Sequence, residues 1–127
     1  MINTRLNNMK EYLKANIKHF LVLNFNELEL TKYVTINANC DRSLLNGTYV
    51  KTEFVAPSWY NELSSMKKPI LVINNIDDID ELEQRKFLEI LKYNKISTFE
   101  LPQNCVIIVT CSSLNINREV FSLLVRV

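Results

Sequence analysis

The chain has 127 residues, of which 47% are hydrophobic and 23% are charged, as expected of one globular domain with a core of ordinary size. Its 15 basic and 14 acidic residues nearly cancel, so the overall charge gives no support to nucleic acid or an anionic membrane as a partner. The sequence contains no run of about 18 apolar residues that could span a membrane, and from the lack of an apolar run near residue 1 we expect no secretory leader. We therefore expect a single cytoplasmic domain over residues 1–127, without membrane contact.

The glycine and cysteine content narrows the chemistry further. Gly47 is the only glycine, whereas the phosphate-binding loops GxxxxGK[ST] and GxGxxG each need several. The sequence therefore excludes both loops and predicts no bound cofactor. Cys40, Cys105 and Cys111 are odd in number and lack CxxC spacing, which predicts reduced thiols and no zinc or other metal site.

The N-terminal part predicts one helix and two strands. Residues 5–18 form an amphipathic pattern that Thr4 can cap,. The apolar face of this helix consists of Leu6, Met9, Leu13 and Ile17. Residues 19–25 and 33–40 have the length and composition of strands.

The middle of the chain predicts shorter elements. Residues 41–47 resemble a turn, and residues 48–55 are rich in β-branched and aromatic residues, which indicates a short hairpin or an edge strand,. Residues 58–66 predict a short helix with Ser58 as its N-cap.

Two apolar runs predict buried strands, "ILVIN" at residues 70–74 and "VIIVT" at residues 106–110,. Between them, residues 78–94 predict a helix of about four turns, capped by Asp78 or Asp80. Its inward-facing residues are Leu82, Phe87, Ile90 and Leu91. A strand, a helix and a strand in this order form a right-handed βαβ unit.

A short helix and a final strand at residues 125–127 complete the predicted elements. The pattern as a whole predicts an α/β protein, a three-layer sandwich with a mostly parallel central sheet flanked by helices.

From about residue 33 onward, the order of elements resembles the core of an AAA+ ATPase. It is most similar to the branch of magnesium-chelatase and midasin-like ATPases. "LLNGTYVKTEFVAPSWYNEL" resembles the segment that leads into the Walker B strand, and "NKISTFELPQNCVIIVT" resembles the connection to the sensor 1 strand. The resemblance covers about three-quarters of the chain. It implies a P-loop NTPase-like fold that stops where the helical lid would begin.

The residues that carry chemistry in that family differ here. Walker A is absent, and the Asp and Glu of Walker B fall on Asn74 and Asn75. Hard cations prefer anionic oxygen ligands, and an amide cannot act as a general base. The sensor 1 Asn falls on Ser112. The resemblance therefore implies a degenerate site without catalytic residues.

The arginine finger of the family also has no counterpart in the matching place. In the family, this arginine directly follows a serine. The corresponding pair here is Ser122 and Leu123, so a leucine stands where the family has the arginine. Arg126 comes three positions later, on the expected last strand. Because phosphoryl transfer depends on positioning and electrostatic stabilisation by such groups, we expect a protein that is not an enzyme.

The topology of residues 1–40 leaves two alternatives. In the family, a phosphate loop and a helix separate the first two strands, but here only "NELELTK" lies between residues 19–25 and 33–40. Either these two strands form a hairpin, or the helix at residues 5–18 replaces the helix after the phosphate loop and the first strand is lost. These seven residues are fewer than the dozen or so that a parallel crossover needs, and of the two alternatives we prefer the second.

Four acidic residues, Asp77, Asp78, Asp80 and Glu81, follow the strand at residues 70–74. They could bind a cation, but their spacing is not that of a calcium loop, and helix capping with a solvated first turn is the favoured interpretation.

Three other features have an alternative functional interpretation. His19 could be part of a catalytic dyad, but it has no fixed partner in the sequence. The basic stripe of Lys10, Lys14 and Lys18 could touch phosphates, although a solvated helix face is favoured. Trp59 and Tyr60 could form an exposed recognition pair, although core packing is more common for such residues on an amphipathic helix.

The functional expectation is a non-catalytic AAA+-like domain that acts through protein–protein contacts. It would be an adaptor, a regulator or an inert subunit that docks with an active AAA+ ATPase. One alternative is a small nucleic-acid-associated module of replication or recombination machinery, which the charge does not support. A second alternative is a truncated ATPase remnant that exposes a surface and forms a homo-oligomer.

Overall fold

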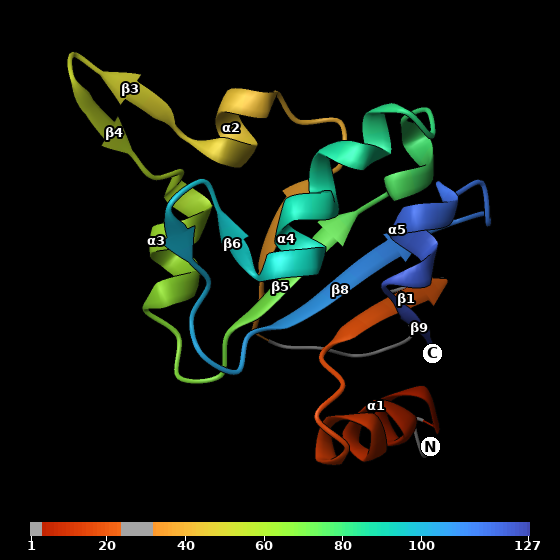
Figure 1. The fold of residues 1–127 in the computed structure, drawn as a ribbon. Helices are drawn as coiled ribbons and strands as arrows, with labels where there is room; N and C mark the ends of the chain where they lie inside the picture. Colours follow the sequence, from red (N-terminus) through yellow and green to blue (C-terminus); the bar gives the residue numbers. More distant parts are fainter. Residues whose placement is uncertain (1–3, 24–31) are drawn as a thin grey trace.

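The structure is a computed structural model that describes residues 4–23 and 32–127, without the side chains of residues 4–6. Its centre is a five-stranded parallel sheet in the order β2-β5-β8-β1-β9 (Figure 1). These strands are β1 (His19–Leu23), β2 (Val34–Asn37), β5 (Ile70–Asn74), β8 (Val106–Cys111) and β9 (Val125–Arg126). The predicted α/β architecture with a parallel central sheet flanked by helices is confirmed.

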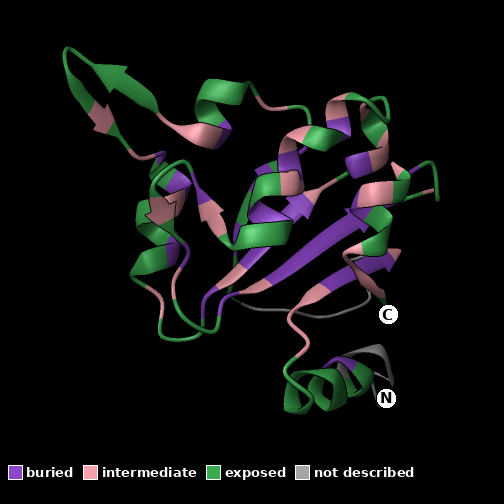
Figure 2. Ribbon diagram, viewed as in Figure 1, coloured by how far each residue is buried: buried purple, intermediate pink, exposed green. Residues whose placement is uncertain are grey.

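Strands β5 and β8 form the centre of the sheet, as their apolar runs predict. They pair in parallel, with Ile70 opposite Val106 and Ile73 opposite Val109. Alternate residues on each strand face opposite sides of the sheet, and both sides are buried in the middle of these strands (Figure 2). This pairing confirms that β5 and β8 are neighbouring parallel strands, as expected of a βαβ unit.

Helices cover both faces of the sheet, so the core has two parts. The larger part includes residues of α2 (Arg42–Asn46), α3 (Ser58–Ser64), the 3₁₀ helix η3 (Glu83–Phe87), α4 (Leu88–Tyr93) and α5 (Arg118–Ser122). The smaller part lies on the other face, where α1 (Thr4–Lys14) contributes Met9. Met9 packs there with Phe20, Val22, Val72 and Ile108.

The position of β1 rules out a hairpin between β1 and β2. Strand β1 lies between β8 and β9, whereas the described part of β2 pairs with β5. The connection is therefore a parallel crossover, and only residues 24–33 are available for it. The expectation that about a dozen residues are needed was too strict, because ten extended residues can span roughly 33–36 Å.

Helix α1 is shorter than the sequence pattern indicates. It ends at Lys14, and Asn16 adopts a left-handed conformation with φ of 65° that turns the chain into β1. Ile17 therefore packs near the sheet from outside the helix, and Leu13 is 37% exposed. The predicted Thr4 cap and the side chain of Leu6 lie outside the described residues.

The predicted helix at residues 78–94 was wrong in its first half. The chain forms a 3₁₀ turn, η2 (Ile76–Asp78), then extends at Ile79, and becomes helical only with η3 and α4. The Asp80 carboxylate accepts a hydrogen bond from the Glu83 backbone N–H at 2.8 Å and so fixes the later start,. Leu82 precedes that start and is 76% exposed, although it was expected to face inward.

Two hairpins complete the fold. Strands β3 (Thr48–Val50) and β4 (Glu53–Val55) pair in the hairpin that was one of two alternatives, and α2 occupies most of the predicted turn before it. A second hairpin, β6 (Lys95–Ile96) and β7 (Phe99–Glu100), was not predicted. Ser58 is the first residue of α3 and not its N-cap, which is Pro57.

Candidate functional site at the carboxyl edge of the sheet

Polar side chains from three neighbouring strands meet at the carboxyl edge of the sheet. Asn74 is the last residue of β5, Thr35 comes from β2, and Thr110 comes from β8. The Asn74 side-chain amide donates to the Thr35 hydroxyl at 2.7 Å, and its oxygen accepts from the Thr110 hydroxyl at 3.2 Å. Asn74 therefore ties three strands together, and both ends of its amide are occupied.

Asn75 takes part in the same network through its backbone. Its N–H donates to the Thr110 hydroxyl at 3.0 Å, and its side chain is exposed. Asn75 has φ of 61° and ψ of 52°, the left-handed conformation that Asn tolerates better than most other non-glycine residues,. The amide at this position thus suits the sharp turn out of β5, and a glutamate there would be conformationally strained.

Asp77 is the carboxylate nearest to this network in the sequence, but it is already engaged. Its two carboxylate oxygens accept hydrogen bonds from the backbone N–H and hydroxyl groups of Ser112 and Ser113, at distances of 2.9–3.3 Å. It fastens η2 to the loop that follows β8. The interpretation of Asp77 as a helix cap or a solvated side chain was wrong, whereas the Asp80 carboxylate does accept a hydrogen bond from the backbone N–H of Glu83, the first residue of η3.

Hydrogen bonding also determines the protonation of Asp77. Partial burial raises the pKa of this carboxyl, but the hydrogen bonds from Ser112 and Ser113 outweigh it and leave the pKa below its ordinary value,. Because the folded-state pKa is depressed, the stabilisation is complete above the unfolded pKa of about 3.9 and is lost as the pH falls through the folded-state pKa.

Asp77→Asn is expected to lower the free energy of unfolding by about 1 kcal/mol at neutral pH, since charge-assisted hydrogen bonds on a partly exposed group are replaced by weaker ones. The difference from the unsubstituted protein should shrink below about pH 4. Urea unfolding at several pH values measures it. Asp78→Asn is the control, because Asp78 is exposed and no side-chain contact ties it to the described residues; equal pH profiles for both variants would contradict this role of Asp77.

The remaining positions that the resemblance singles out are Ser112, Leu123 and Arg126, and they do not all lie at this edge. Ser112 lies against Asp77, but Leu123 ends α5 and is partly buried against the main core. Arg126 is exposed on β9. Burial raises the pKa of Cys111, the charge of Asp77 raises it further, and Arg126 opposes both. Arg126 and Asp77 are therefore both near the end of β8.

Among the described residues, the edge offers no ligand set for a divalent cation. The Asp77 carboxylate is occupied by Ser112 and Ser113, and Asn74, Thr35 and Thr110 are neutral amide and hydroxyl groups, which bind hard cations weakly compared with carboxylates. Within the described residues, no group of three or more His, Cys, Asp or Glu side chains could hold a metal ion. The network of Asn74, Thr35 and Thr110 can hold the three strands in register, and these three described side chains include no general base,.

Trp59 does not form an exposed recognition pair with Tyr60. Trp59 is only 5% exposed, and its indole N–H lies 3.2 Å from the carbonyl oxygens of both Leu44 and Leu45. Tyr60 is half-buried, and its hydroxyl donates to the Glu100 carbonyl at 2.6 Å. Trp59 is therefore a core residue, which was the favoured interpretation. The Tyr60 hydroxyl instead connects α3 to β7.

His19 lies at the opposite, amino edge of the sheet. Its Nε2 is 2.8 Å from the side-chain oxygen of Asn94, and burial lowers its pKa. Lys10 and Lys14 are exposed, as the interpretation of a solvated helix face predicts. Lys18 does not belong to that face, because it follows the end of α1, is half-buried and donates to the side-chain oxygen of Asn104 at 3.1 Å. All three cysteines are free thiols; Cys105 and Cys111 are buried, and burial raises the pKa of Cys105 to about 12.

The sequence analysis missed one buried amide close to this edge. Gln84 is fully buried, donates to the carbonyls of Ile79 and Asn115, and accepts from the backbone N–H of Asn117 at 2.6 Å. It joins the loop after β5 to the loop after β8. No sequence signal marks such a residue, because its partners are backbone groups and two of them, on Asn115 and Asn117, are more than thirty residues away in the chain.

Comparison with known proteins adds no relative. No protein-family model, curated protein or solved structure matches the chain. In the part of the chain that the structure describes, no helix is long and apolar enough to cross a membrane. The fold and the geometry of its surface are therefore the basis for a functional proposal.

Proposed function

We propose that this chain is a non-catalytic domain of the AAA+ type that acts through contacts with another protein, as an adaptor, a regulator or an inert subunit of an ATPase assembly. The observation that carries the proposal is the network of Asn74 with Thr35 and Thr110. Amides and hydroxyls occupy the strand end at which the resemblance implies magnesium and water chemistry.

The order of the strands supports an AAA+-type origin. Numbered along the chain, the strands of the sheet lie in the order 2-3-4-1-5, which is also the strand order of the AAA+ core. In that order β1 corresponds to the strand before the phosphate loop. This argues against the preferred alternative in which the first strand is lost, and suggests that the loop and its helix are the missing parts.

The length of the crossover supports the absence of a nucleotide cradle. Only residues 24–33 connect β1 to β2. A phosphate loop of the Walker A type occupies about eight positions before its helix begins, and a helix that packs on a sheet needs several more turns. Ten residues cannot supply both, and none of them is glycine.

Isothermal titration with ATP and magnesium tests the proposal. We expect no binding heat at nucleotide concentrations up to the millimolar range, and no phosphate release, because the sequence contains no phosphate loop and has Asn74 and Asn75 at the strand end where the family has acidic residues,. Clear binding or turnover would contradict the proposal.

Asn74→Asp sharpens this test. The carboxylate can accept hydrogen bonds from Thr35 and Thr110, so the variant should fold, and it restores an acidic residue where the family has one,. We expect it to remain unable to bind ATP, because the phosphate cradle is still missing. Recovery of ATP binding would show that a hidden cradle exists and that the missing loop has been replaced.

A further inference from the structure

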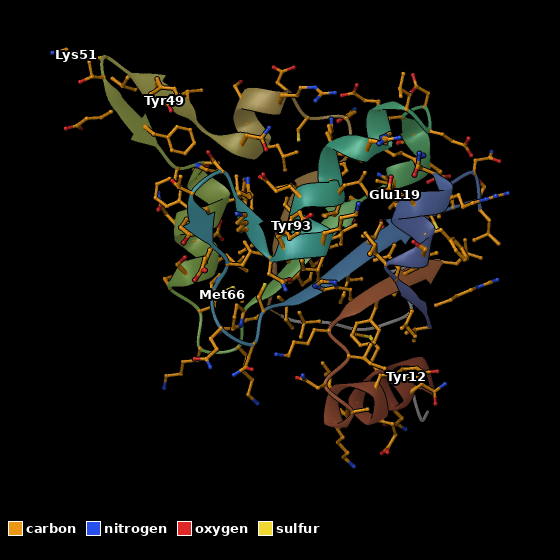
Figure 3. All side chains as sticks on the ribbon, in the orientation of Figure 1. Tyr12, Tyr49, Lys51, Met66, Tyr93 and Glu119 are labelled. Carbon is orange, nitrogen blue, oxygen red and sulfur yellow. The ribbon has the colours of Figure 1, made fainter. Side chains whose placement is uncertain are left out.

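The β3–β4 hairpin projects from the body of the protein and exposes apolar side chains. Figure 1 shows it extending away from the sheet, and Figure 3 shows Tyr49 and Lys51 toward its far end. Tyr49 is 73% exposed, Val50 56% and Val55 45%. Among the described residues, β3 pairs only with β4, so the outer edge of β3 is open for another strand,.

A row of aromatic rings holds the hairpin against the body. Tyr49 lies across from Phe54 with ring centroids 5.2 Å apart, Phe54 stacks on Phe99 at 5.4 Å, and Phe99 contacts Tyr60 at 5.5 Å. Tyr60 in turn meets the buried Trp59 edge-on. The projecting strands are therefore anchored to the core, which lowers the entropic cost of binding an extended partner.

An open hollow of about 330 Å³ lies at the base of the hairpin. Its apolar lining comes from Leu44, Val55, Ala56 and Pro57. Its polar lining residues are Asp41, Ser43, Thr48 and Ser58. Asp41 is the only charged residue of the lining, so the hollow combines apolar walls with a single negative charge.

The carboxylate of Asp41 is not used by the fold. Asp41 occupies the N-cap position of α2, where an Asp side chain commonly accepts a backbone hydrogen bond, yet it makes no capping bond,. Within the described residues it has no salt bridge, in contrast to its neighbour Arg42, which pairs with Glu83 at 3.3 Å. The exposed Asp41 carboxylate is thus available to a ligand.

The geometry points to a docking site for an extended basic peptide segment of a protein partner, bound along β3 with a Lys or Arg side chain in the Asp41 hollow. The aliphatic stem of that side chain packs against Leu44, Val55 and Pro57, and its charge pairs with Asp41. The peptide backbone adds a strand to the open edge of β3. This inference rests on the proposed function only in taking the partner to be a protein.

The negative charge of Asp41 favours a basic peptide over the other ligands that an exposed hairpin could bind. A phosphate backbone would place negative charge against Asp41 and would find no Lys or Arg in the lining,. A peptide with a Glu at the central position would be repelled in the same way, whereas one with an uncharged side chain of equal length would keep only the apolar contact.

The test is an NMR titration of the isotope-labelled full chain with three peptides, Ac-Thr-Val-Lys-Val-Thr-amide and its counterparts with norleucine or Glu in place of Lys. The Lys peptide is expected to shift the backbone amides of Gly47, Thr48 and Val55. It should also shift the indole N–H of Trp59, the only tryptophan, which contacts α2. The norleucine peptide should bind more weakly and the Glu peptide should cause no shift.

Variants at Asp41 test the role of its charge. Asp41→Asn should weaken binding of the Lys peptide about two- to fivefold, the range for an exposed ion pair. Asp41→Lys should abolish it and favour the Glu peptide. The matched control, Asp78→Asn, removes an exposed carboxylate at the other side of the β5 turn and should leave the affinity unchanged.

Three results would overturn the inference. They are no shifts with the Lys peptide at millimolar concentration, equal binding of the Lys and Glu peptides, or hairpin shifts that depend on protein concentration without peptide, which would identify a second copy as the occupant. The peptide and nucleotide experiments fail independently. ATP binding with an intact peptide site would defeat the proposed function alone, and absent peptide binding without ATP binding would defeat the inference alone.

Discussion

Ile73→Asp is expected to prevent folding. Ile73 has no exposed surface and pairs with Ile36 on β2 and Val109 on β8, in the middle of the sheet. The substitution removes an apolar contribution of roughly 1.5–3 kcal/mol and buries a carboxylate without a partner, at an effective cost of several kcal/mol. The sum is comparable to the whole stability of a domain, about 5–15 kcal/mol. Far-UV circular dichroism and size-exclusion chromatography measure the loss.

Val50→Asp is the matched control, since it places the same residue on a β-branched strand position that is 56% exposed. We expect it to change the free energy of unfolding by less than about 1 kcal/mol. A soluble Ile73→Asp protein with an unchanged thermal melt would show that Ile73 does not lie in the centre of the sheet.

The sequence predicted the central sheet because its strands are apolar on both faces. A run such as residues 70–73, uninterrupted by polar residues, fits no surface strand and indicates burial between layers. The partner strand at residues 106–110 has the same property, and a helical segment of suitable length lies between them. Their pairing therefore followed from local pattern and from the handedness of crossovers.

The helical segment between these strands shows where local pattern fails. Leu82 has the spacing of an inward-facing residue, but the chain extends at Ile79 and helix begins only after Asp80. Several acidic residues near one another could each cap the start of a helix, and the tertiary contacts of these residues determine which one does. Here Asp77 is taken by Ser112 and Ser113, and Gln84 holds the loop after β8. Neither contact is visible in the sequence.

The candidate site was predicted in position but not in its contacts. Asn74 and Asn75 follow a buried strand, so their place at the carboxyl edge followed from the fold. Their partners Thr35 and Thr110 come from strands more than thirty residues away along the chain. The left-handed conformation of Asn75 also depends on the turn that the tertiary structure imposes.

Asp41 shows a different limit of the sequence analysis, which expected a turn over residues 41–47. The structure has helix α2 there, and Asp41 occupies its N-cap position without a capping hydrogen bond. The side chain lies instead beside a hollow formed by α2, the hairpin and the start of α3. Only the packing of these three elements reveals the free carboxylate, and the proposed peptide site depends on that packing.

Gly47→Ala is expected to destabilise the protein by at least about 2 kcal/mol and to displace the hairpin. Gly47 has φ of 85° and ψ of 177°, a conformation essentially restricted to glycine and costly for any other residue,. A Cβ atom there would lie 2.5 Å from the carbonyl oxygen of Val55 and 2.9 Å from the ring of Phe54. The backbone of β4 must therefore move away from α2, which opens the Asp41 hollow.

Urea unfolding followed by the fluorescence of Trp59 measures this effect, because the Trp59 indole N–H contacts the α2 carbonyls just before Gly47. Ser97→Ala is the control at another positive φ, 53°, where a Cβ atom is already accommodated, and it should change the free energy of unfolding by less than about 0.5 kcal/mol,. If Gly47→Ala were equally mild, β3 and α2 could separate without cost. The hairpin would then be too loosely held to present a preformed edge to a peptide.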